Sequence, residues 1–259
     1  MRMMKKVLGT VTVLALSVSL LAGCGSTAAS PVSSAASTAA ESTTSSVVSE
    51  TTSAAADENV AAAAQLLNDL TGSYQELWPV ILADEYKQTW LDVCTALVGE
   101  DNAEAAFEKL SSMVTGDVYG EDAVEAYANG GGAYFCGFTN SLATLTFDGE
   151  TSTISGTDKD GNVLFSHTYH YIGMEPAHGL YEFESDDADS GEFTYFFLAP
   201  DTSAETYHIE FRYGSDAEAL SQYDAGEYAY WVASGISTDC DQTMIDNCIE
   251  LFCTENLAG

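Results

Sequence analysis

Between residue 59 and about residue 128, hydrophobic residues recur at helical spacing. Apolar positions follow one another at intervals of three and four, as in Leu66, Leu67 and Leu70 and again in Trp90 and Cys94. This spacing is typical of amphipathic helices, and glycine and proline interrupt it at intervals. The predicted helices span residues 58–70, 84–98, 102–115 and 121–128.

The pattern changes after the Gly130–Gly132 run. Short stretches rich in Tyr, Phe, Thr and Val alternate with Asp and Gly, and Asp148-Gly149 and Asp160-Gly161 are hairpin signals. About eight closely spaced strands without intervening helices indicate an antiparallel sheet, either a closed barrel or a sandwich. A last amphipathic pattern predicts a helix over 238–254. The predicted strands span residues 132–138, 142–148, 151–156, 162–173, 179–185, 192–199, 205–213 and 226–234.

The amino terminus has the plan of a secretory signal. A basic start precedes an uninterrupted run of apolar and small residues from Val7 to Gly23, which is short for a membrane span. The end of this run, Leu21-Ala22-Gly23-Cys24, resembles the lipobox of bacterial lipoproteins. That resemblance implies cleavage before Cys24 and a lipid on its thiol, and the alternative is an ordinary secretory signal. We expect a protein held by its lipid at the outer face of the cytoplasmic membrane.

Composition divides the chain further. Residues 24–57 are almost wholly Ser, Thr, Ala and Val, so they cannot bury enough apolar surface to offset the entropy of ordering. Residues 58–259 contain all 14 Tyr, 11 Phe and 3 Trp. We therefore predict a signal peptide (1–23), a lipidated cysteine with a disordered tether (24–57), and one domain (58–259). This domain is expected to be mainly helical over 58–128, a β-barrel over 129–235 and helical over 236–259.

The charge restricts the partners. The chain has 7 Lys and Arg against 40 Asp and Glu, and removal of residues 1–23 leaves 4 basic residues. Such a chain repels nucleic acid and anionic lipid headgroups. It attracts metal ions and basic proteins, or the acidic residues simply keep its surface soluble. We expect membrane contact only through the anchor.

Five cysteines remain besides Cys24. No C-x-x-C occurs, which argues against a zinc ribbon or a thioredoxin-type motif. Cys248 lies at helical spacing with apolar neighbours, which favours a core position. One disulfide is compatible with an exported protein, but the spacing does not identify its partners.

The sequence lacks the motifs of the common enzyme classes. It has no G-x-S-x-G, H-E-x-x-H, P-loop or G-x-G-x-x-G motif, and few basic residues that could hold an anionic substrate. Residues 158–162 resemble the start of a calcium loop, but Tyr169 stands where Glu is required. The acidic run 186–192 is interpreted as a solvated turn, with a weak calcium site as the alternative. We interpret the protein as a binder and not as an enzyme.

Several stretches of the domain carry a family resemblance. They are residues 70–79, 181–195 and 205–215, followed by 228–231 and the terminal helix. Together, and in this order, they resemble the ZinT (YodA) family. The resemblance extends over most of residues 66–256. It implies an exported zinc-binding domain with an α+β fold, in which a lipocalin-like antiparallel barrel carries N-terminal helices and a C-terminal helix. Related domains are fused to the binding proteins of zinc ABC importers, so the resemblance also implies such an importer as a partner.

The resemblance further implies metal ligands. The family's His-x-His pair falls on His208 and Glu210, and this spacing directs both side chains to one face of a strand. A further family histidine falls on Asp201, whereas a shifted gap would place Phe196 or another residue there. Imidazole and carboxylates together are an acceptable zinc set, and an oxygen-rich set also suits Mn²⁺ or Ca²⁺. The alternative for His208 is a histidine hydrogen-bonded in place on a half-buried strand.

The other histidines are candidates for a fourth ligand. His167 and His170 differ by three positions, so they face opposite sides of a regular strand. Either of them, or His178, could complete the set from a neighbouring strand, and the alternative is a surface histidine.

Two functions remain. The first is a lipid-anchored protein that captures zinc outside the membrane and passes it to an uptake system. The second keeps the barrel without a metal: its mouth, lined by Tyr and Phe, holds a small apolar or aromatic molecule, or the domain binds a partner protein.

Overall fold

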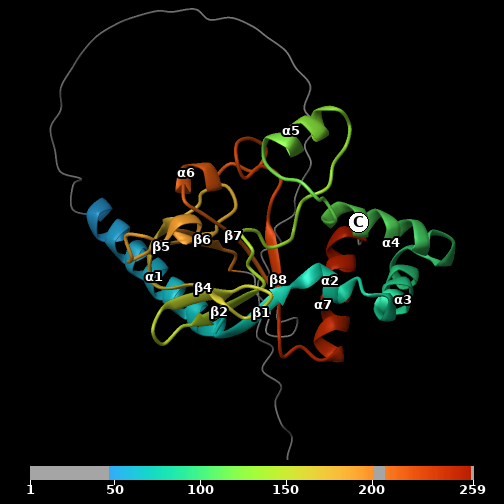
Figure 1. Ribbon diagram of the computed structural model, residues 1–259, viewed down its shortest axis with the longest axis horizontal. Helices are drawn as coiled ribbons and strands as arrows, with labels where there is room; N and C mark the ends of the chain where they lie inside the picture. Colours follow the sequence, from blue (N-terminus) through green and yellow to red (C-terminus); the bar gives the residue numbers. More distant parts are fainter. Residues whose placement is uncertain (1–46, 201–207, 258–259) are drawn as a thin grey trace, which may run out of the picture. The chain divides into compact units, whose positions relative to one another are not determined.

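The computed structural model describes residues 47–200 and 208–257, with side chains from residue 58 onward (Figure 1). The chain divides into two units, residues 1–60 and 61–259, and the account below concerns the second, apart from the bounds of the helix that begins at Val47. The signal segment, Cys24 and Asp201 lie outside the described residues. Within the described part, no helix has the length and apolar character needed to span a bilayer.

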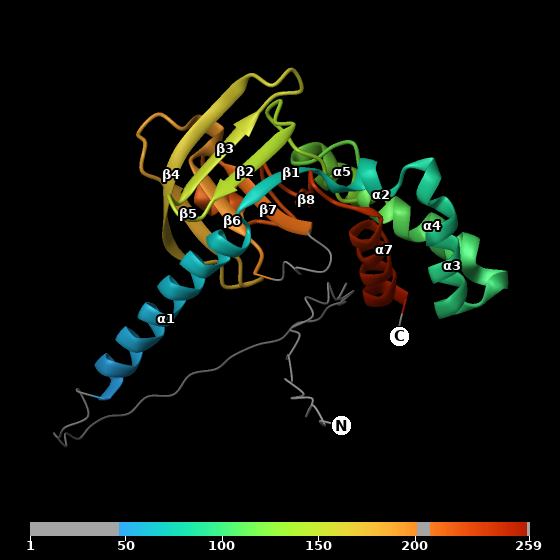
Figure 2. The same ribbon diagram turned by 90° about the horizontal axis from the view of Figure 1, so that it is seen from below.

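Eight antiparallel strands form a closed barrel in which each strand pairs with the next and β8 pairs with β1 (Figure 2). This confirms the predicted α+β fold with an antiparallel barrel and excludes the sandwich. Closure leaves none of the eight strands with an unpaired edge. The strands are β1 (Gly72–Glu76), β2 (Thr144–Asp148), β3 (Thr153–Thr157), β4 (Val163–Met174), β5 (Tyr181–Ser185), β6 (Tyr195–Leu198), β7 (His208–Gly214) and β8 (Ala233–Ser237).

Aromatic side chains fill the barrel. Phe147, Phe183, Phe196, Phe211 and Tyr213 are at most 1 % exposed and belong to one buried cluster. Alternation along each strand turns every second side chain into this core. The core is therefore packed with rings, which stabilise it through the large apolar area that each one buries.

One of the helices, α1, packs directly against the barrel. Helix α1 packs its buried residues, Leu66 and Leu70 among them, against the barrel core. The Gly149 backbone lies so close to Asn68 that a Cβ there would be 2.4 Å from the Asn68 Cα, so α1 can approach the β2–β3 turn only because residue 149 is glycine. The helices are α1 (Val47–Asp69), α2 (Leu77–Ile81), η1 (Asp84–Tyr86), α3 (Lys87–Val98), α4 (Glu100–Val114), α5 (Glu121–Ala128), η2 (Gly191–Phe193), α6 (Ala217–Leu220) and α7 (Gln242–Leu257).

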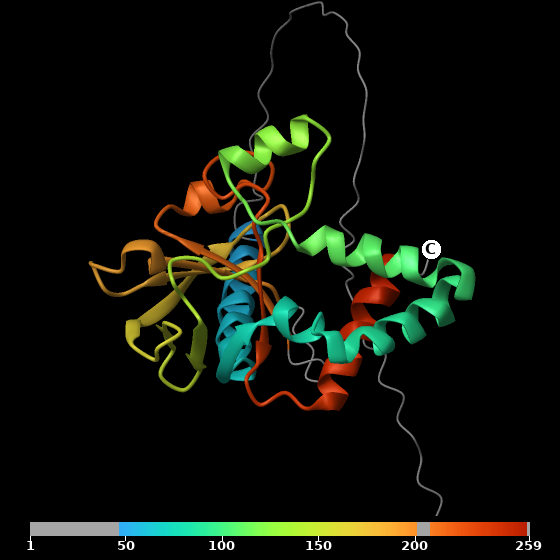
Figure 3. The same cartoon turned by 45° about the vertical axis from the view of Figure 1, so that its right-hand side comes forward.

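A second core lies between helices and the outer face of β8. Trp78 of α2, Trp90 of α3, Leu110 of α4 and Ile249 of α7 cluster with Ile236 of β8. Figure 3 shows α7 (red) beside α3 and α4 (blue-green to green). The side chains of β8 thus alternate between the barrel core and the helical core.

Two predicted strands differ from the structure, and one strand of the barrel was not predicted. Residues 132–138 form no barrel strand: Phe135 makes only isolated bridges, to Thr115 and Trp231. Residues 226–232 are irregular because Tyr230 has a φ of 58°, so β8 begins at Ala233. The strand that completes the barrel in their place is β1, which was not predicted and lies within the region expected to be helical.

The first helix also begins earlier than expected. Helix α1 starts at Val47, within the segment predicted to be a tether. This segment leads into the alanine-rich residues 54–64, and alanine has the highest helix propensity.

Candidate functional site

The outer face of β7 carries the two predicted ligands that the structure describes. Ile209 and Phe211 are buried in the barrel core, so His208 and Glu210 project from the opposite face. Glu210 lies opposite Ser234 of β8 in the strand pairing. Both ligand candidates are half-buried. The structure therefore brings His208 and Glu210 together on one face, as their spacing predicts.

Two buried thiols lie near Glu210. Burial raises the pKa of Cys136 to about 12, and the Glu210 carboxylate adds to the rise. Burial also raises the pKa of Cys248 to about 12, with further contributions from Cys240 and Glu210. Both thiols are therefore protonated at neutral pH, and each would have to release its proton to bind a metal. Glu210 accordingly offers a metal a carboxylate beside two neutral thiols.

The described residues do not complete a metal site. Across 47–200 and 208–257, no three His, Cys, Asp or Glu side chains are placed so that they could hold one ion. His208 and Glu210 match the donor types that zinc accepts and would supply two of four ligands. Asp201, the third predicted ligand, lies in the undescribed segment that directly precedes β7.

The histidines of β4 are bonded to an acidic turn. His167 Nδ1 is 2.8 Å from Asp187 Oδ2, and His170 Nδ1 is 2.7 Å from Asp186 Oδ1. The strand directs the two rings to opposite faces, which confirms the expectation from their spacing. Because β5 and β6 separate β4 from β7, these histidines lie on no strand adjacent to His208.

A buried arginine on β7 was not anticipated from the sequence. Arg212 is fully buried, and its guanidinium donates to the main-chain oxygens of Leu220, Gln222 and Tyr228. The Tyr223 ring stacks on it at 4.2 Å. Burial lowers the pKa of Arg212, and the interaction with Tyr223 opposes that change. A hint was present in the sequence, because this rare cation stands between two aromatic residues on a strand of buried character.

A buried carboxylate lies near the same tyrosine. Glu175 is 2 % exposed and accepts from the Ala177 and His178 main-chain N–H groups at 2.8 and 2.7 Å. The His178 ring lies 3.8 Å from the Tyr223 ring, between centroids. Tyr223 thus contacts both Arg212 and His178, and Glu175 is close enough to Arg212 for its charge to act on the guanidinium. His178 therefore bonds to a carboxylate of its own turn.

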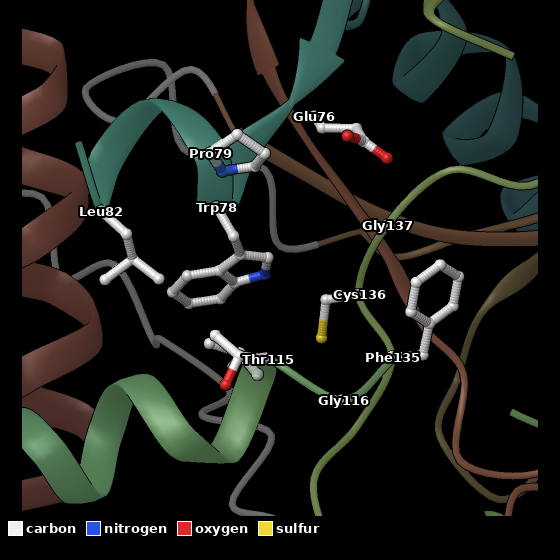
Figure 4. Close-up of a pocket in the computed structure, with 10 residues that line it drawn as sticks. Glu76, Trp78, Pro79, Leu82, Thr115, Gly116, Phe135, Cys136 and Gly137 are labelled. Atoms are coloured by element: carbon white, nitrogen blue, oxygen red, sulfur yellow. The ribbon is translucent and has the colours of Figure 1, made fainter. Parts of the chain in front are cut away.

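Two pockets of the described part lie outside the barrel core. One, of about 350 Å³, is lined by residues of β1, α2, the end of α4 and residues 135–137 (Figure 4). The other, of about 260 Å³, is lined by residues 115–118, α5 and residues 132–133. Aromatic rings fill the barrel core, and these two pockets offer space to a small molecule outside it.

A comparison with solved structures finds the Zn(II)-bound ZinT-like domain of Streptococcus pneumoniae AdcA. The identity is 15%, the TM-score is 0.44, and the match covers 70% of this chain and 87% of that chain. The structure is similar to a ZinT-like domain. Zn(II)-bound AdcA from the same organism matches at 14% identity and a TM-score of 0.41, over 71% of this chain and 34% of that chain. No protein-family model and no curated protein matches the chain.

Proposed function

We propose that this chain is a lipid-anchored, extracytoplasmic zinc-binding protein that captures zinc for an uptake system. The observation that carries the proposal is the shared outward face of His208 and Glu210 on β7, at the positions that match the family's His-x-His pair. An imidazole and a carboxylate on one strand face form a donor pair of the kind zinc uses. The acidic chain, with a net charge of −33, also raises the local concentration of cations.

The third ligand in this proposal is Asp201. Its support is the alignment with the family, because the residue lies outside the described part. A fourth position filled by water would leave the ion open to exchange, which suits a protein that must give its metal away. His167, His170 and His178 are less suited to this position, since each already has a carboxylate partner.

The test is a zinc titration of the full-length, metal-free chain in competition with a chelator, together with elemental analysis. We expect one tightly bound zinc per chain. The double variant His208→Ala/Glu210→Ala should lose tight binding, and Asp201→Asn should weaken it. A matched control is His170→Ala/Glu184→Ala, which removes the same two side-chain types from the β4–β5 pair and should keep the affinity of the parent.

Other outcomes would contradict the proposal. Full affinity in the His208/Glu210 double variant, with the circular dichroism of the parent, would refute the ligand assignment. Weak, multiple and salt-sensitive binding would mean that the carboxylates act only as a diffuse cation atmosphere. The metal-free binding of a small molecule would then become the leading function.

The membrane anchor has its own test. Replacement of Cys24 by Ala removes the thiol that a lipid would modify, so we expect the protein to move from the membrane fraction to the soluble fraction. Mass spectrometry of the parent should show the acyl chains on Cys24. An unmodified Cys24 in a chain cleaved elsewhere would indicate an ordinary secretory signal.

A further inference from the structure

The pocket of about 350 Å³ beside α2 adjoins the proposed metal site. Cys136 lines this pocket, and its main-chain oxygen accepts the Ser234 N–H at 3.0 Å. Ser234 lies opposite Glu210 in the pairing of β8 with β7, so both side chains project from the same outer face. The Ser234 side chain is hydrogen-bonded to the Cys136 thiol. Cys136 therefore borders the pocket and stands in one lateral row with Ser234 and Glu210.

The pocket is open to solvent and wide enough for a hydrated metal ion. Pro79 and Thr115, two of the residues that line it, are exposed. Six water molecules at about 30 Å³ each occupy about 180 Å³, so an octahedral hydrated ion fits within about 350 Å³. A divalent cation can thus enter this pocket without first losing its water ligands.

One carboxylate gives the pocket its charge. Glu76 lies at one side of it, and Glu76 Oε1 accepts the Phe138 main-chain N–H at 2.6 Å (Figure 4). This bond fixes the carboxylate, which keeps further lone pairs that can accept from the water molecules around an ion. The residues that line the pocket include no Lys or Arg. The pocket therefore attracts cations and repels anions.

The other walls are mainly apolar. Trp78, Leu82, Val114 and Phe135 offer an ion no oxygen that could replace its water ligands. An ion in the pocket would therefore keep its water shell and be held weakly. Weak binding suits a passage, because an ion must be attracted strongly enough to enter and weakly enough to leave.

We propose that this pocket is the vestibule of the zinc site on β7, the chamber through which a hydrated divalent cation reaches Glu210. The Glu76 carboxylate holds the ion through its water shell, and the ion passes Cys136 on its way to Glu210. This role rests on the proposed function and adds to it a route and a recruiting residue. Glu76 is not a ligand in the final site, where His208 and Glu210 replace water molecules.

The first test detects an ion in the pocket itself. Manganese(II) is added at low salt to the full-length, ¹⁵N-labelled variant His208→Ala/Glu210→Ala, in which the site on β7 has lost both described ligands. A paramagnetic ion broadens nearby resonances, and the effect falls steeply with distance. The indole N–H resonance of Trp78 should therefore disappear at a lower manganese concentration than that of Trp90, which does not line the pocket. Equal broadening of the two resonances would overturn the proposal.

Two charge variants in the same background test the recruiting residue. Glu76→Gln removes the carboxylate of the pocket, so about tenfold more manganese should be needed for the same broadening of Trp78 at low salt. Glu150→Gln removes the same charge from an exposed residue between β2 and β3 and should leave the broadening unchanged. An effect of the same size in both variants would mean that only the overall acidic charge attracts the ion, and would refute the role of Glu76.

The second test measures how fast zinc reaches the site, by stopped-flow competition with a fluorescent chelator. Glu76→Gln should lower the association and dissociation rate constants alike by about tenfold, and the dissociation constant should change little because Glu76 is not a ligand. Thr115→Phe adds a ring at an exposed lining residue and should slow both steps as well. Tight binding with unchanged rate constants in both variants would refute the vestibule and leave the zinc site intact. Absence of tight zinc binding by the parent would refute the proposed function and, with it, the route.

Discussion

At the residue scale, Arg212 holds the loop between β7 and β8. Its guanidinium reaches the oxygens of three residues that follow it by 8 to 16 positions. These oxygens belong to a loop that does not pair with β7. The arginine therefore supplies the hydrogen-bond donors that a neighbouring strand would otherwise provide. A planar group with several N–H donors suits this role better than a lysine ammonium does.

Replacement of Arg212 by Met should strongly destabilise the protein. The three main-chain oxygens would lose a buried donor, and Glu175 would lose the nearby positive charge. We expect the free energy of unfolding to fall by about 3–5 kcal/mol, measured by urea denaturation. The free energy of unfolding of Arg212→Lys should lie between those of the parent and of Arg212→Met, because lysine keeps the charge but lacks the several N–H donors of the guanidinium. A change below about 1 kcal/mol for Arg212→Met would show that the loop is held by other contacts.

The direction of single side chains was predictable where it depends on local geometry. The shared face of His208 and Glu210, and the opposite faces of His167 and His170, follow from the two-residue period of a strand. The burial of Arg212 was not predictable, because its acceptors come from a loop whose position is decided by tertiary packing. The burial of Glu175 was not predictable either, although its main-chain partners, Ala177 and His178, lie in its own turn.

At the element scale, α3 and α7 bring two cysteines together. The Cys94 and Cys253 sulfur atoms are 4.0 Å apart in the helical core, and both residues are fully buried. The distance is that of two neighbouring thiols and not that of a disulfide. Exported proteins meet oxidising conditions, so this pair is the most favourable place in the described part for a bond between α3 and α7.

Oxidised glutathione should convert Cys94 and Cys253 into a disulfide. The two thiols lose two protons and two electrons, and the glutathione disulfide is reduced to two thiols. Burial raises the pKa of both cysteines, so the reaction should be slow at neutral pH and faster as pH rises and the thiolate forms.

The bond would close a long loop and is expected to stabilise the fold by roughly 4–5 kcal/mol, less any strain. Peptide mapping should find the bond, and the melting temperature should rise. Cys94→Ser should abolish both effects, and Cys240→Ser should leave them intact. A bond between other cysteines, or no change in melting temperature, would contradict this expectation.

The elements themselves were predictable to different extents. The strands β2 to β6 could be predicted, because each is a run of aromatic and branched residues that is bounded by turn residues. Residues 132–138 have the same composition, yet they pair only through isolated bridges. In contrast, β1 has five residues of which only Tyr74 is buried, so it has no alternating apolar pattern that could reveal it.

At the scale of the whole molecule, two buried tyrosines and two half-buried ones link stability to pH. Burial raises the pKa of Tyr127 to about 12, and it raises the pKa values of Tyr169, Tyr213 and Tyr223 further still. The folded state thus favours the protonated phenols. Their contribution to stability is complete below the unfolded-state pKa of about 10 and is lost as pH rises from there through the folded-state values.

We therefore expect cooperative unfolding in alkali. Each of the two buried phenols, Tyr169 and Tyr213, costs about 1.4 kcal/mol of stability per pH unit above about pH 10, and the half-buried Tyr127 and Tyr223 cost less. Tyrosinate absorbance and circular dichroism, followed in parallel, should change in one steep transition above that pH. Gradual ionisation near pH 10 without loss of structure would mean that these phenols are accessible to solvent in the folded state.

The closure of the barrel by β1 and β8 ties the end of folding to the proposed site on β7. Tyr74 pairs with Ser237, so two segments from opposite ends of the domain must meet before the ring of strands is complete. Contacts so distant along the chain form late, because a long loop must close first. Until β8 pairs with β7, one edge of β7 is open. The sheet face that carries His208 and Glu210 then lacks its neighbouring strand on that side. Tight zinc binding at the proposed site is thus expected only of chains that have finished folding.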